Sequence, residues 1–513
     1  MLTEDELRVK VSELVAYARD HISMNAENRI YVTNILLDFF NLTYPAPIPE
    51  KYGDFQTEII DPIVQHAVDT GRIKPEEALL FETKVLGIVT PTPAEIISEF
   101  DSIAGNKGVQ DATTWLFELS KANNYIRMPD IRKNIKWSHE GSIGNIDITI
   151  NLSKPEKDPK AIAAAKLLPK TGYPACMLCP ENVGFAGNLN HPARQTLRTI
   201  PIELDGEPWE LQYSPYQYYT EHVIAFSSEH RPMAVTDAAF RRLLDFVDLF
   251  PHYFIGSNAA LPIVGGSILT HDHYQGGAKV LPMMTRDYRR TYKCVQYPDV
   301  EIGILDWYNS VVRVKGRDRE GVYNMAKRVL DTWFNWTDED SDVICRTDEQ
   351  HNAITPICRN NNGEYVFDLI LRNNRTDEKH PYGIFHPEES MHNIKKEGIG
   401  IIEVMGLFIL PGRLKKELAE VEKYLTGENV LDLKALSDPE NPMCKHAQMI
   451  LQLVNDNGNA NSAARAQKIV TDYVNVTCEK ILECTGVFKN TELGQKCFDK
   501  FMTKGLNLLP AEE

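Results

Sequence analysis

The sequence predicts an α+β protein in which a mainly antiparallel sheet is flanked by helical N- and C-terminal regions. Three observations lead to this fold class. Apolar residues recur at helical spacing up to about residue 150, short β-type runs such as "HVIAF" and "YVFDLILR" lie between about 170 and 420, and helical patterns then return. Short strands mixed with helices are typical of α+β domains. We therefore predict a helical N-terminal domain over 1–150, a core over 151–420 and a helical C-terminal region over 421–513.

The N-terminal domain begins with a clear helix signal. Thr3 and Glu6 have the spacing of a capping box, in which each side chain accepts a hydrogen bond from the backbone N–H of the other residue. Apolar positions follow at intervals of three and four, as on one face of a helix. These positions are Leu7, Val11, Leu14 and Val15.

The end of this domain is marked by a change of periodicity. Ile146, Ile148 and Ile150 alternate as in a strand, and a polar, proline-containing stretch follows over 151–160. The segment "SAARAQKIVTDYV" is typical of the helices that return near the C-terminus. A domain boundary is therefore expected within 140–160.

Composition and charge limit the classes of function that the chain can have. With 43% hydrophobic and 25% charged residues, the chain resembles ordinary globular proteins. The acidic start "MLTEDELRVK" argues against a signal peptide, and no apolar run approaches the ~18 residues of a membrane span. The net charge of −17 argues against nonspecific nucleic-acid binding, which needs a basic surface. We expect a cytoplasmic enzyme or binding protein.

The cysteines suggest a metal site. The chain has nine, an odd number that argues against a disulfide framework, and only Cys176 and Cys179 are close neighbours, in "CMLC". Zinc takes four tetrahedral ligands from thiolates and imidazoles, and a CxxC turn provides two of them. His230 in "AFSSEHRP" and His271 in "GGSILTHDHYQGG" can provide the other two. A redox dithiol, or two unrelated buried thiols, are the alternatives.

The segment "GGSILTHDHYQGG" also carries a candidate nucleophile. On an extended strand His271, His273 and Gln275 share one face. The neutral imidazole of His273 can attack phosphorus and later leave it, and the amide N–H of Gln275 can donate to the developing negative charge. HxHxQ is a weak pattern by itself, and a structural histidine remains the alternative. The flanking glycines favour a site, because they let a ligand or another backbone come close.

A second histidine cluster occurs in "HPYGIFHPEESMH". His380, His386 and His392 lie there with Glu388 and Glu389. The cluster can be read as a second metal site or as a surface loop broken by prolines.

Three segments together resemble one family. "CMLCPENVGFAGNLNHPARQTLRTIPI", "WELQYSPYQYYTEHVIAFSSEHRPM" and "GGSILTHDHYQGG" are similar, in this order, to class II galactose-1-phosphate uridylyltransferases, a branch of the histidine-triad superfamily. The resemblance covers most of the chain and implies a histidine-triad-like catalytic core. It implies transfer of UMP between UDP-glucose and galactose 1-phosphate, giving glucose 1-phosphate and UDP-galactose through a uridylyl-histidine intermediate. It also implies small-molecule substrates and a homodimer, with neither nucleic acid nor membrane as partner.

The resemblance assigns roles to individual residues. His273 matches the nucleophile of the family motif and Gln275 the residue that steadies the phosphoryl oxygens. In the class I branch, zinc is held by a CxxC pair, a histidine after an "FSP" segment and the first motif histidine. These match Cys176, Cys179, His230 and His271, which are the four ligands that the spacing suggested. Asn258 and Ser267 fall where the family contacts the nucleotide phosphates.

The chain departs from class I at several positions. Asp272 stands where class I has proline, Tyr274 stands where it has glycine, and the C-terminal "HxH" pattern of the second metal site is absent. The second metal is therefore left open. The residues that bind the hexose phosphate are also open, and the basic candidates are Arg194, Arg198, Lys396 and Arg413.

Two other functions fit the same residues. A dinucleoside-polyphosphate phosphorylase or nucleotidyl hydrolase can use His273 and Gln275 without a hexose 1-phosphate. A noncatalytic sugar-nucleotide sensor needs the histidines only to bind phosphate and never carries UMP on a side chain.

Overall fold

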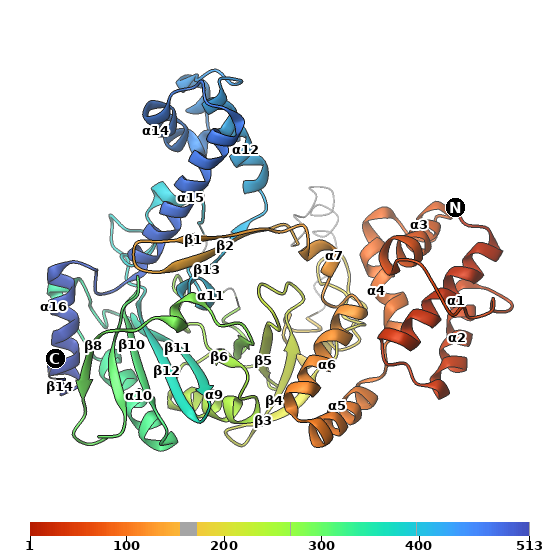
Figure 1. Cartoon of the computed structure of the whole chain (residues 1–513), viewed down its shortest axis with the longest axis horizontal. Coiled ribbons are helices and arrows are strands. Elements are labelled where there is room, and N and C mark those ends of the chain that lie inside the picture. Colours follow the sequence, from red (N-terminus) through yellow and green to blue (C-terminus); the bar gives the residue numbers. More distant parts are fainter. Residues whose placement is uncertain (154–171, 267, 397, 512–513) are drawn as a thin grey trace. The chain divides into compact units, whose positions relative to one another are not determined.

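The computed structural model describes residues 1–153, 172–266, 268–396 and 398–511 (Figure 1). The chain forms two compact units, of which unit 1 contains Met1–Lys133 and Pro155–Arg231 and unit 2 contains Asn134–Lys154 and Pro232–Glu513. From residue 154 onward the polar stretch predicted over 151–160 lies outside the described residues. The three-part division predicted from the sequence stays a prediction.

Unit 1 begins with a series of helices, the first four of which share one apolar core. These helices are α1 (Glu4–His21), α2 (Ala26–Phe40), α3 (Asp61–Asp69), α4 (Ala78–Val89), α5 (Pro93–Lys107), α6 (Val109–Ala122) and α7 (Met128–Ile131). The predicted capping box is confirmed, since the Glu6 carboxylate accepts from the Thr3 backbone N–H at 2.7 Å and the Thr3 hydroxyl accepts from that of Glu6. The four apolar positions predicted for the first helix are buried in this core.

The strands of unit 1 form a short antiparallel ladder. They are β3 (Ile200–Leu204), β4 (Glu207–Tyr213) and β5 (Val223–Ser227), and β4 pairs with both neighbours. Trp209 in β4 is fully buried, so the ladder contributes an apolar side chain to the interior of the protein. The strand predicted at "HVIAF" is β5, and His230 lies three residues after its end.

Unit 2 contains a small sheet built from distant parts of the chain. Its strands are β1 (Ile135–Glu140), β2 (Asn145–Asn151) and β13 (Leu407–Pro411), with β1 antiparallel and β13 parallel to β2. Ile146, Ile148 and Ile150 are buried along β2, which confirms the predicted alternation.

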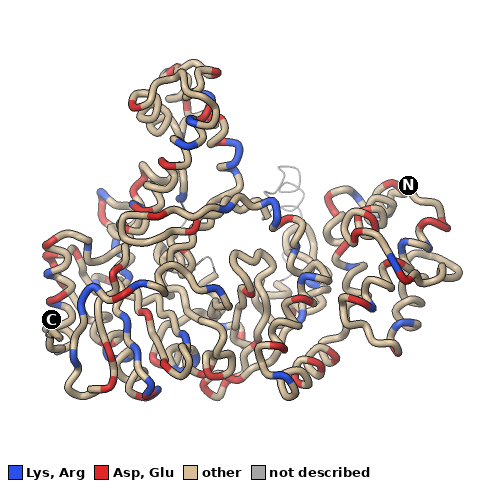
Figure 2. The backbone as a smooth tube through the Cα atoms, in the orientation of Figure 1, with Lys and Arg blue, Asp and Glu red and all other residues tan. Residues whose placement is uncertain are grey.

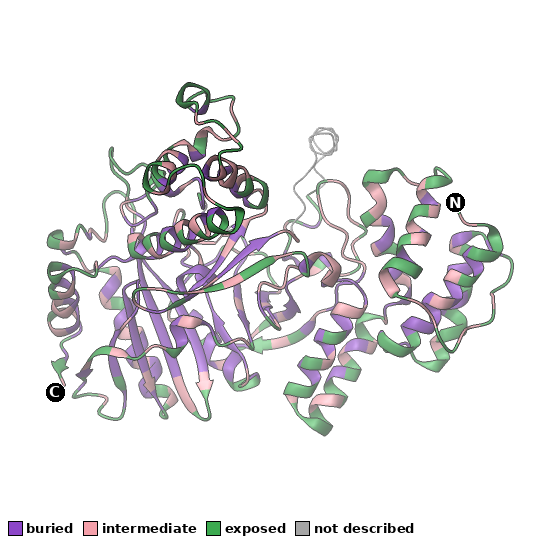
Figure 3. Cartoon of the chain, turned by 45° about the horizontal axis from the view of Figure 1, so that its top comes forward, coloured by how far each residue is buried: buried purple, intermediate pink, exposed green. Residues whose placement is uncertain are grey.

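Eight further strands of unit 2 form an antiparallel array whose central strands are strongly buried. In spatial order they are β14 (Leu509–Pro510), β8 (Tyr288–Lys293), β9 (Glu301–Leu305), β10 (Val311–Gly316), β12 (Glu364–Asn373), β11 (Asn352–Asn361), β6 (Phe254–Gly256) and β7 (His273–Gly277). Each neighbouring pair is antiparallel. Figure 3 shows most of β10, β11 and β12 buried. The predicted α+β class with a mainly antiparallel sheet is confirmed.

Helices cover this array and continue to the C-terminus. They are α9 (Asp237–Leu249), α10 (Arg319–Phe334), α11 (Ile401–Val404), α12 (Leu414–Thr426), α13 (Leu433–Leu436), α14 (Ala447–Asn457), α15 (Ala463–Thr485) and α16 (Glu492–Lys500). α9 and α10 pack on the central strands, and α12 packs on α14 and α15. The predicted helical C-terminal region is thereby confirmed. Within the described ranges, no helix combines the length and apolarity of a membrane span.

Charge is distributed along both units, and one ionic group lies inside unit 2. Figure 2 shows acidic and basic residues interspersed along the backbone. The fully buried Asp368 of β12 meets Arg313 of β10 at 2.5 Å and also pairs with Arg359 of β11. Burial opposes ionisation, but the guanidinium groups of Arg359 and Arg313 outweigh it and hold the pKa of Asp368 below its ordinary value. One carboxylate thus joins three adjacent strands through two buried ion pairs.

Replacing this carboxylate should destabilise the fold in a pH-dependent way. Because D368N leaves two buried guanidinium groups without their counter-ion, we expect a loss of about 3–5 kcal/mol at pH 7. A depressed folded pKa contributes stability above the unfolded value of about 4 and loses it as pH falls, so the loss should shrink below about pH 4. Urea unfolding at several pH values measures this. D331N removes an exposed pair with Lys327 and should cost at most about 1 kcal/mol. Equal losses in both variants would contradict the account.

Candidate functional site

The HxHxQ segment only partly forms the strand that the sequence predicts. β7 begins at His273, so His273 and Gln275 share one face, whereas His271 and Asp272 lie before the strand. The prediction of one strand through His271 is wrong for its first two residues. The pairing of β7 with β6 covers only Gln275 to Gly277, so β6 does not extend the strand back to His271.

A glycine allows β6 and β7 to approach. A Cβ atom on Gly276 would lie 2.0 Å from the Phe254 carbonyl oxygen, which is backbone and cannot rotate away. The expectation that the flanking glycines admit a close neighbour is confirmed at this position, where the neighbour is another backbone.

The orientation of the His273 ring is set by a backbone carbonyl. The side chain is buried, 6% exposed, and its Nδ1 lies 2.8 Å from the carbonyl oxygen of His271. A carbonyl oxygen only accepts, so Nδ1 carries the proton and Nε2 keeps the lone pair of the neutral ring. Burial lowers the pKa of His273 to about 4, although the hydrogen bond opposes this shift. At neutral pH the ring is therefore an uncharged base whose free lone pair lies on Nε2.

A buried ion pair supports the same segment. Asp272, between the two motif histidines, lies 3.7 Å from Arg242 of α9, and both side chains are buried. The aspartate that distinguishes this chain from class I therefore links the segment to a helix of unit 2.

The CxxC turn has the geometry of a metal ligand pair. The Sγ atoms of Cys176 and Cys179 are 3.4 Å apart, and Cys179 Sγ lies 3.1 Å from His230 Nδ1. A disulfide needs about 2.05 Å, so both cysteines are thiols. The edges of a tetrahedral zinc site are about 3.5–3.8 Å, so these atoms need only small shifts to surround a cation.

Three of the four predicted metal ligands lie together in unit 1, and the fourth, His271, belongs to unit 2. Cys176, Cys179 and His230 each offer a ligand atom, and these atoms lie within 4.8 Å of one another. The cluster is compatible with zinc. Burial, together with the hydrogen bond between the thiols, raises the pKa of Cys179 to about 11. A bound cation favours the thiolate and acts against that shift.

Two residues that the sequence did not single out fix the CxxC turn. The Nδ2 group of buried Asn182 donates to the carbonyl oxygens of Cys176 and Cys179, both at 2.8 Å. Its Oδ1 lies 2.6 Å from His191 Nε2, so this ring nitrogen donates to it. Both residues lie in "CPENVGFAGNLNHP". Their hydrogen bonds to the turn and to each other are visible only in the three-dimensional structure.

The predicted phosphate-binding residues have different surroundings. Asn258 is buried, and its Oδ1 accepts from the Ile401 backbone N–H at the start of α11. Ser267 lies outside the described residues.

The basic candidates for the hexose phosphate also differ from one another. Arg198 donates to four backbone carbonyls, of Pro91, Gln195, Leu197 and Thr90, which favours a structural role. Arg413 pairs with Glu417, Lys396 lies near the Tyr382 ring, and Arg194 lies near that of Tyr125.

The histidines of "HPYGIFHPEESMH" have local partners. His386 Nδ1 and His392 Nε2 lie 3.1 and 3.0 Å from the Pro387 carbonyl oxygen, and His380 pairs with Asp377. Among the described residues, the groups of three or more closely spaced ligand atoms do not include these histidines.

Comparisons with known proteins agree over most of the chain. Residues 24–232 match the model of the N-terminal domain of galactose-1-phosphate uridyl transferase, and residues 246–438 match that of its C-terminal domain. The galactose-1-phosphate uridylyltransferase of Caldanaerobacter subterraneus is 44% identical over 511 residues, which cover 98% of each chain. That of Bacillus subtilis is 41% identical over 500 residues, or 96% of each chain.

A solved structure, the yeast Ap4A phosphorylase Apa2, is matched at 12% identity with a TM-score of 0.30, covering 64% of this chain and 89% of that one. A similarity this low carries no argument. On the family models and the curated relatives, the chain belongs to the galactose-1-phosphate uridylyltransferase family. The family resemblance and the enzyme class predicted from the sequence are confirmed.

Adding one methyl group at Gly276 should separate β6 from β7. G276A places Cβ against the Phe254 carbonyl, so we expect a loss of about 1–3 kcal/mol in the free energy of unfolding, measured by urea denaturation. Gly105 in α5 has open space around its Cβ position, and G105A should instead be neutral or stabilising by up to about 1 kcal/mol. A G276A protein as stable as the unmodified chain would show that the close approach is absent.

Proposed function

We propose that the chain transfers UMP between UDP-glucose and galactose 1-phosphate, giving glucose 1-phosphate and UDP-galactose, with His273 as the residue that carries UMP. The observation that carries this proposal is the buried, neutral His273 ring whose Nδ1 is held by the His271 carbonyl. Family membership supports the substrates, since the curated relatives named above are galactose-1-phosphate uridylyltransferases.

The proposed reaction proceeds in two displacements at one phosphorus atom. First, the Nε2 lone pair attacks the α-phosphorus of UDP-glucose, the bond from this phosphorus to the bridging oxygen breaks, and glucose 1-phosphate leaves. The ring then carries a positive charge, which the Nδ1–H donation to the His271 carbonyl stabilises. Second, a phosphate oxygen of galactose 1-phosphate attacks the same phosphorus, the P–N bond breaks, and neutral His273 returns. Two anions never need to react directly with each other.

Neighbouring polar groups complete the proposed site. Gln275 follows His273 on the same face of β7, and its amide N–H donates to the non-bridging oxygens where charge develops. Asn258 uses its Oδ1 to cap α11, so its Nδ2 is the donor that it offers to a phosphate. Ser267 is proposed as a second phosphate contact on the basis of the family resemblance.

We assign a structural zinc ion to Cys176, Cys179, His230 and His271. Four protein ligands leave a tetrahedral ion with no open position, so the ion contributes rigidity and no chemistry. His271 then has two roles, since its ring is a ligand and its carbonyl orients His273. The composition favours a cytoplasmic protein, and the resemblance favours a homodimer, which sedimentation of the purified chain tests.

The covalent intermediate is directly measurable. On brief incubation with UDP-glucose alone, the intact protein should gain the mass of one UMP, and galactose 1-phosphate should remove it. H273A should show no gain and lose at least about 10³-fold in transfer rate. H139A removes a histidine of β1 that pairs with Glu479, and it should keep the adduct.

The absence of an adduct in active protein would contradict the covalent mechanism. An adduct that phosphate or water discharges faster than galactose 1-phosphate would favour a phosphorylase or hydrolase instead.

The zinc assignment predicts a specific loss of metal. C179S should reduce bound zinc, measured by atomic emission, from about one ion per chain to near zero and lower the melting temperature. C444S replaces a half-buried thiol outside the cluster and should retain the metal. Full zinc content in C179S would overturn the ligand assignment.

A further inference from the structure

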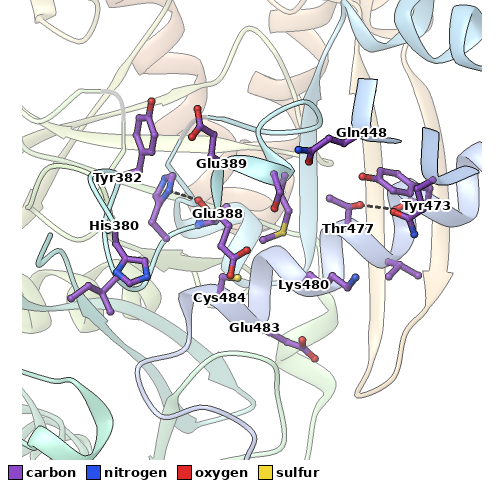
Figure 4. A pocket seen from close by; sticks show the side chains of 18 of the residues that line it. His380, Tyr382, Glu388, Glu389, Gln448, Tyr473, Thr477, Lys480, Glu483 and Cys484 are labelled. Atoms are coloured by element: carbon purple, nitrogen blue, oxygen red, sulfur yellow. Dashed lines mark hydrogen bonds between the residues drawn. The ribbon is translucent and has the colours of Figure 1, made fainter. Parts of the chain in front are cut away.

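Unit 2 contains a pocket of about 1140 Å³ whose described lining includes none of residues 271–275. Its walls come from the loop over 379–391, from α14 and from α15 (Figure 4). Drug-sized ligands occupy pockets of roughly 300–1,000 Å³, so this one has room for a small molecule with several rings.

One long face of α15 lies open to the pocket. The residues of this face follow one another at spacings of three and four, and so form one stripe of the helix, about 22 Å long. They are Ile469, Tyr473, Val476, Lys480 and Cys484. A different face of α15 packs on α12 and supplies buried residues to the core. The pocket-facing stripe is therefore not needed to hold the helix in the fold, and Val476 is 46% exposed on it.

The charges of the lining do not suit a phosphate. The lining contains three lysines and four carboxylates, and the carboxylates include Glu388 and Glu389. One of the lysines, Lys489, already donates to the carbonyl oxygens of Glu483 and Cys484 at the end of α15. Phosphate sites instead gather unopposed cations and backbone N–H groups. The ligand expected here has no net negative charge.

The hydrogen-bonding groups of the lining are rich in acceptors. His386 donates through Nδ1 to the Pro387 carbonyl, which leaves Nε2 as an acceptor, and burial keeps the pKa of His386 near 4, so the ring is neutral. The carboxylates add further acceptors, and carboxamides of α14 such as Gln448 and Gln452 both donate and accept. Such walls match a ligand with many O–H donors.

Aromatic and aliphatic side chains provide apolar contact surface beside these polar groups. Tyr382, 38% exposed, and Tyr473 are both labelled in Figure 4 and come from opposite walls, and Leu453 of α14 also lines the pocket. Rings of this kind pack against the C–H surface of a small cyclic molecule.

We propose that this pocket is a second binding site, separate from the His273 centre, that takes a neutral sugar. Hydroxyl groups of the sugar donate to the carboxylates and to His386 and exchange hydrogen bonds with the α14 carboxamides, while its C–H face contacts Tyr382 and Tyr473. The site goes beyond the proposed transfer reaction, whose substrates are phosphorylated, and its existence does not depend on that reaction.

The test uses D-galactose and lactose as probes, with saturation-transfer NMR on the full chain and on H273A. Both proteins should bind at least one of these sugars saturably, with the same Kd. Q452A should raise this Kd at least tenfold and leave the transfer rate unchanged. Asn455 is an exposed carboxamide of α14 that does not line the pocket, and N455A is the matched control that should keep both values.

Each remaining outcome overturns the proposal. The absence of saturable binding of either sugar excludes a neutral-sugar site, and binding that Q452A leaves unchanged places the sugar elsewhere. Binding of galactose 1-phosphate or inorganic phosphate that Q452A weakens, without binding of the free sugars, shows that the pocket selects anions. Sugar binding is also measured on H273A, which cannot form the adduct. A failure of sugar binding is therefore distinguishable from a failure of the transferase mechanism.

Discussion

The chemistry proposed for this chain depends on one hydrogen bond, from His273 Nδ1–H to the carbonyl oxygen of His271. A backbone carbonyl cannot change its role, so it fixes the tautomer, the ring orientation and the atom that attacks phosphorus. Burial keeps the same ring neutral at physiological pH. A histidine held in this way is prepared both to accept a phosphoryl group and to release it.

The surrounding structure holds the two ends of that hydrogen bond. β7 carries His273 against β6, at a distance that only glycine at position 276 allows. Asp272 links the residues before the strand to Arg242 of α9. Asn182 fixes the CxxC turn of unit 1. The proposed zinc ion, with His271 as its fourth ligand, would stabilise the peptide that orients His273.

Local signals made much of this predictable from the sequence. The capping box at Thr3, the alternation along β2 and the CxxC spacing depend on residues close together in the chain, and each has the expected structure. The strand through His271 was predicted too long, because strand length depends on pairing with distant segments, which the alternation within β7 does not show. Asp368 with its two arginines, Asn182 with His191, and the pocket beside α15 depend on distant segments that only the fold brings together.

The position of phosphorus on the ring tests the central claim most directly. A chain with ¹⁵N-labelled histidine, incubated with UDP-glucose and denatured under alkaline conditions, can be examined for coupling between ³¹P and the ring nitrogens. We expect one modified histidine, His273, with phosphorus on Nε2, because Nδ1 keeps the proton that it donates in the hydrogen bond to the His271 carbonyl. Phosphorus on Nδ1, or on another histidine, would contradict it.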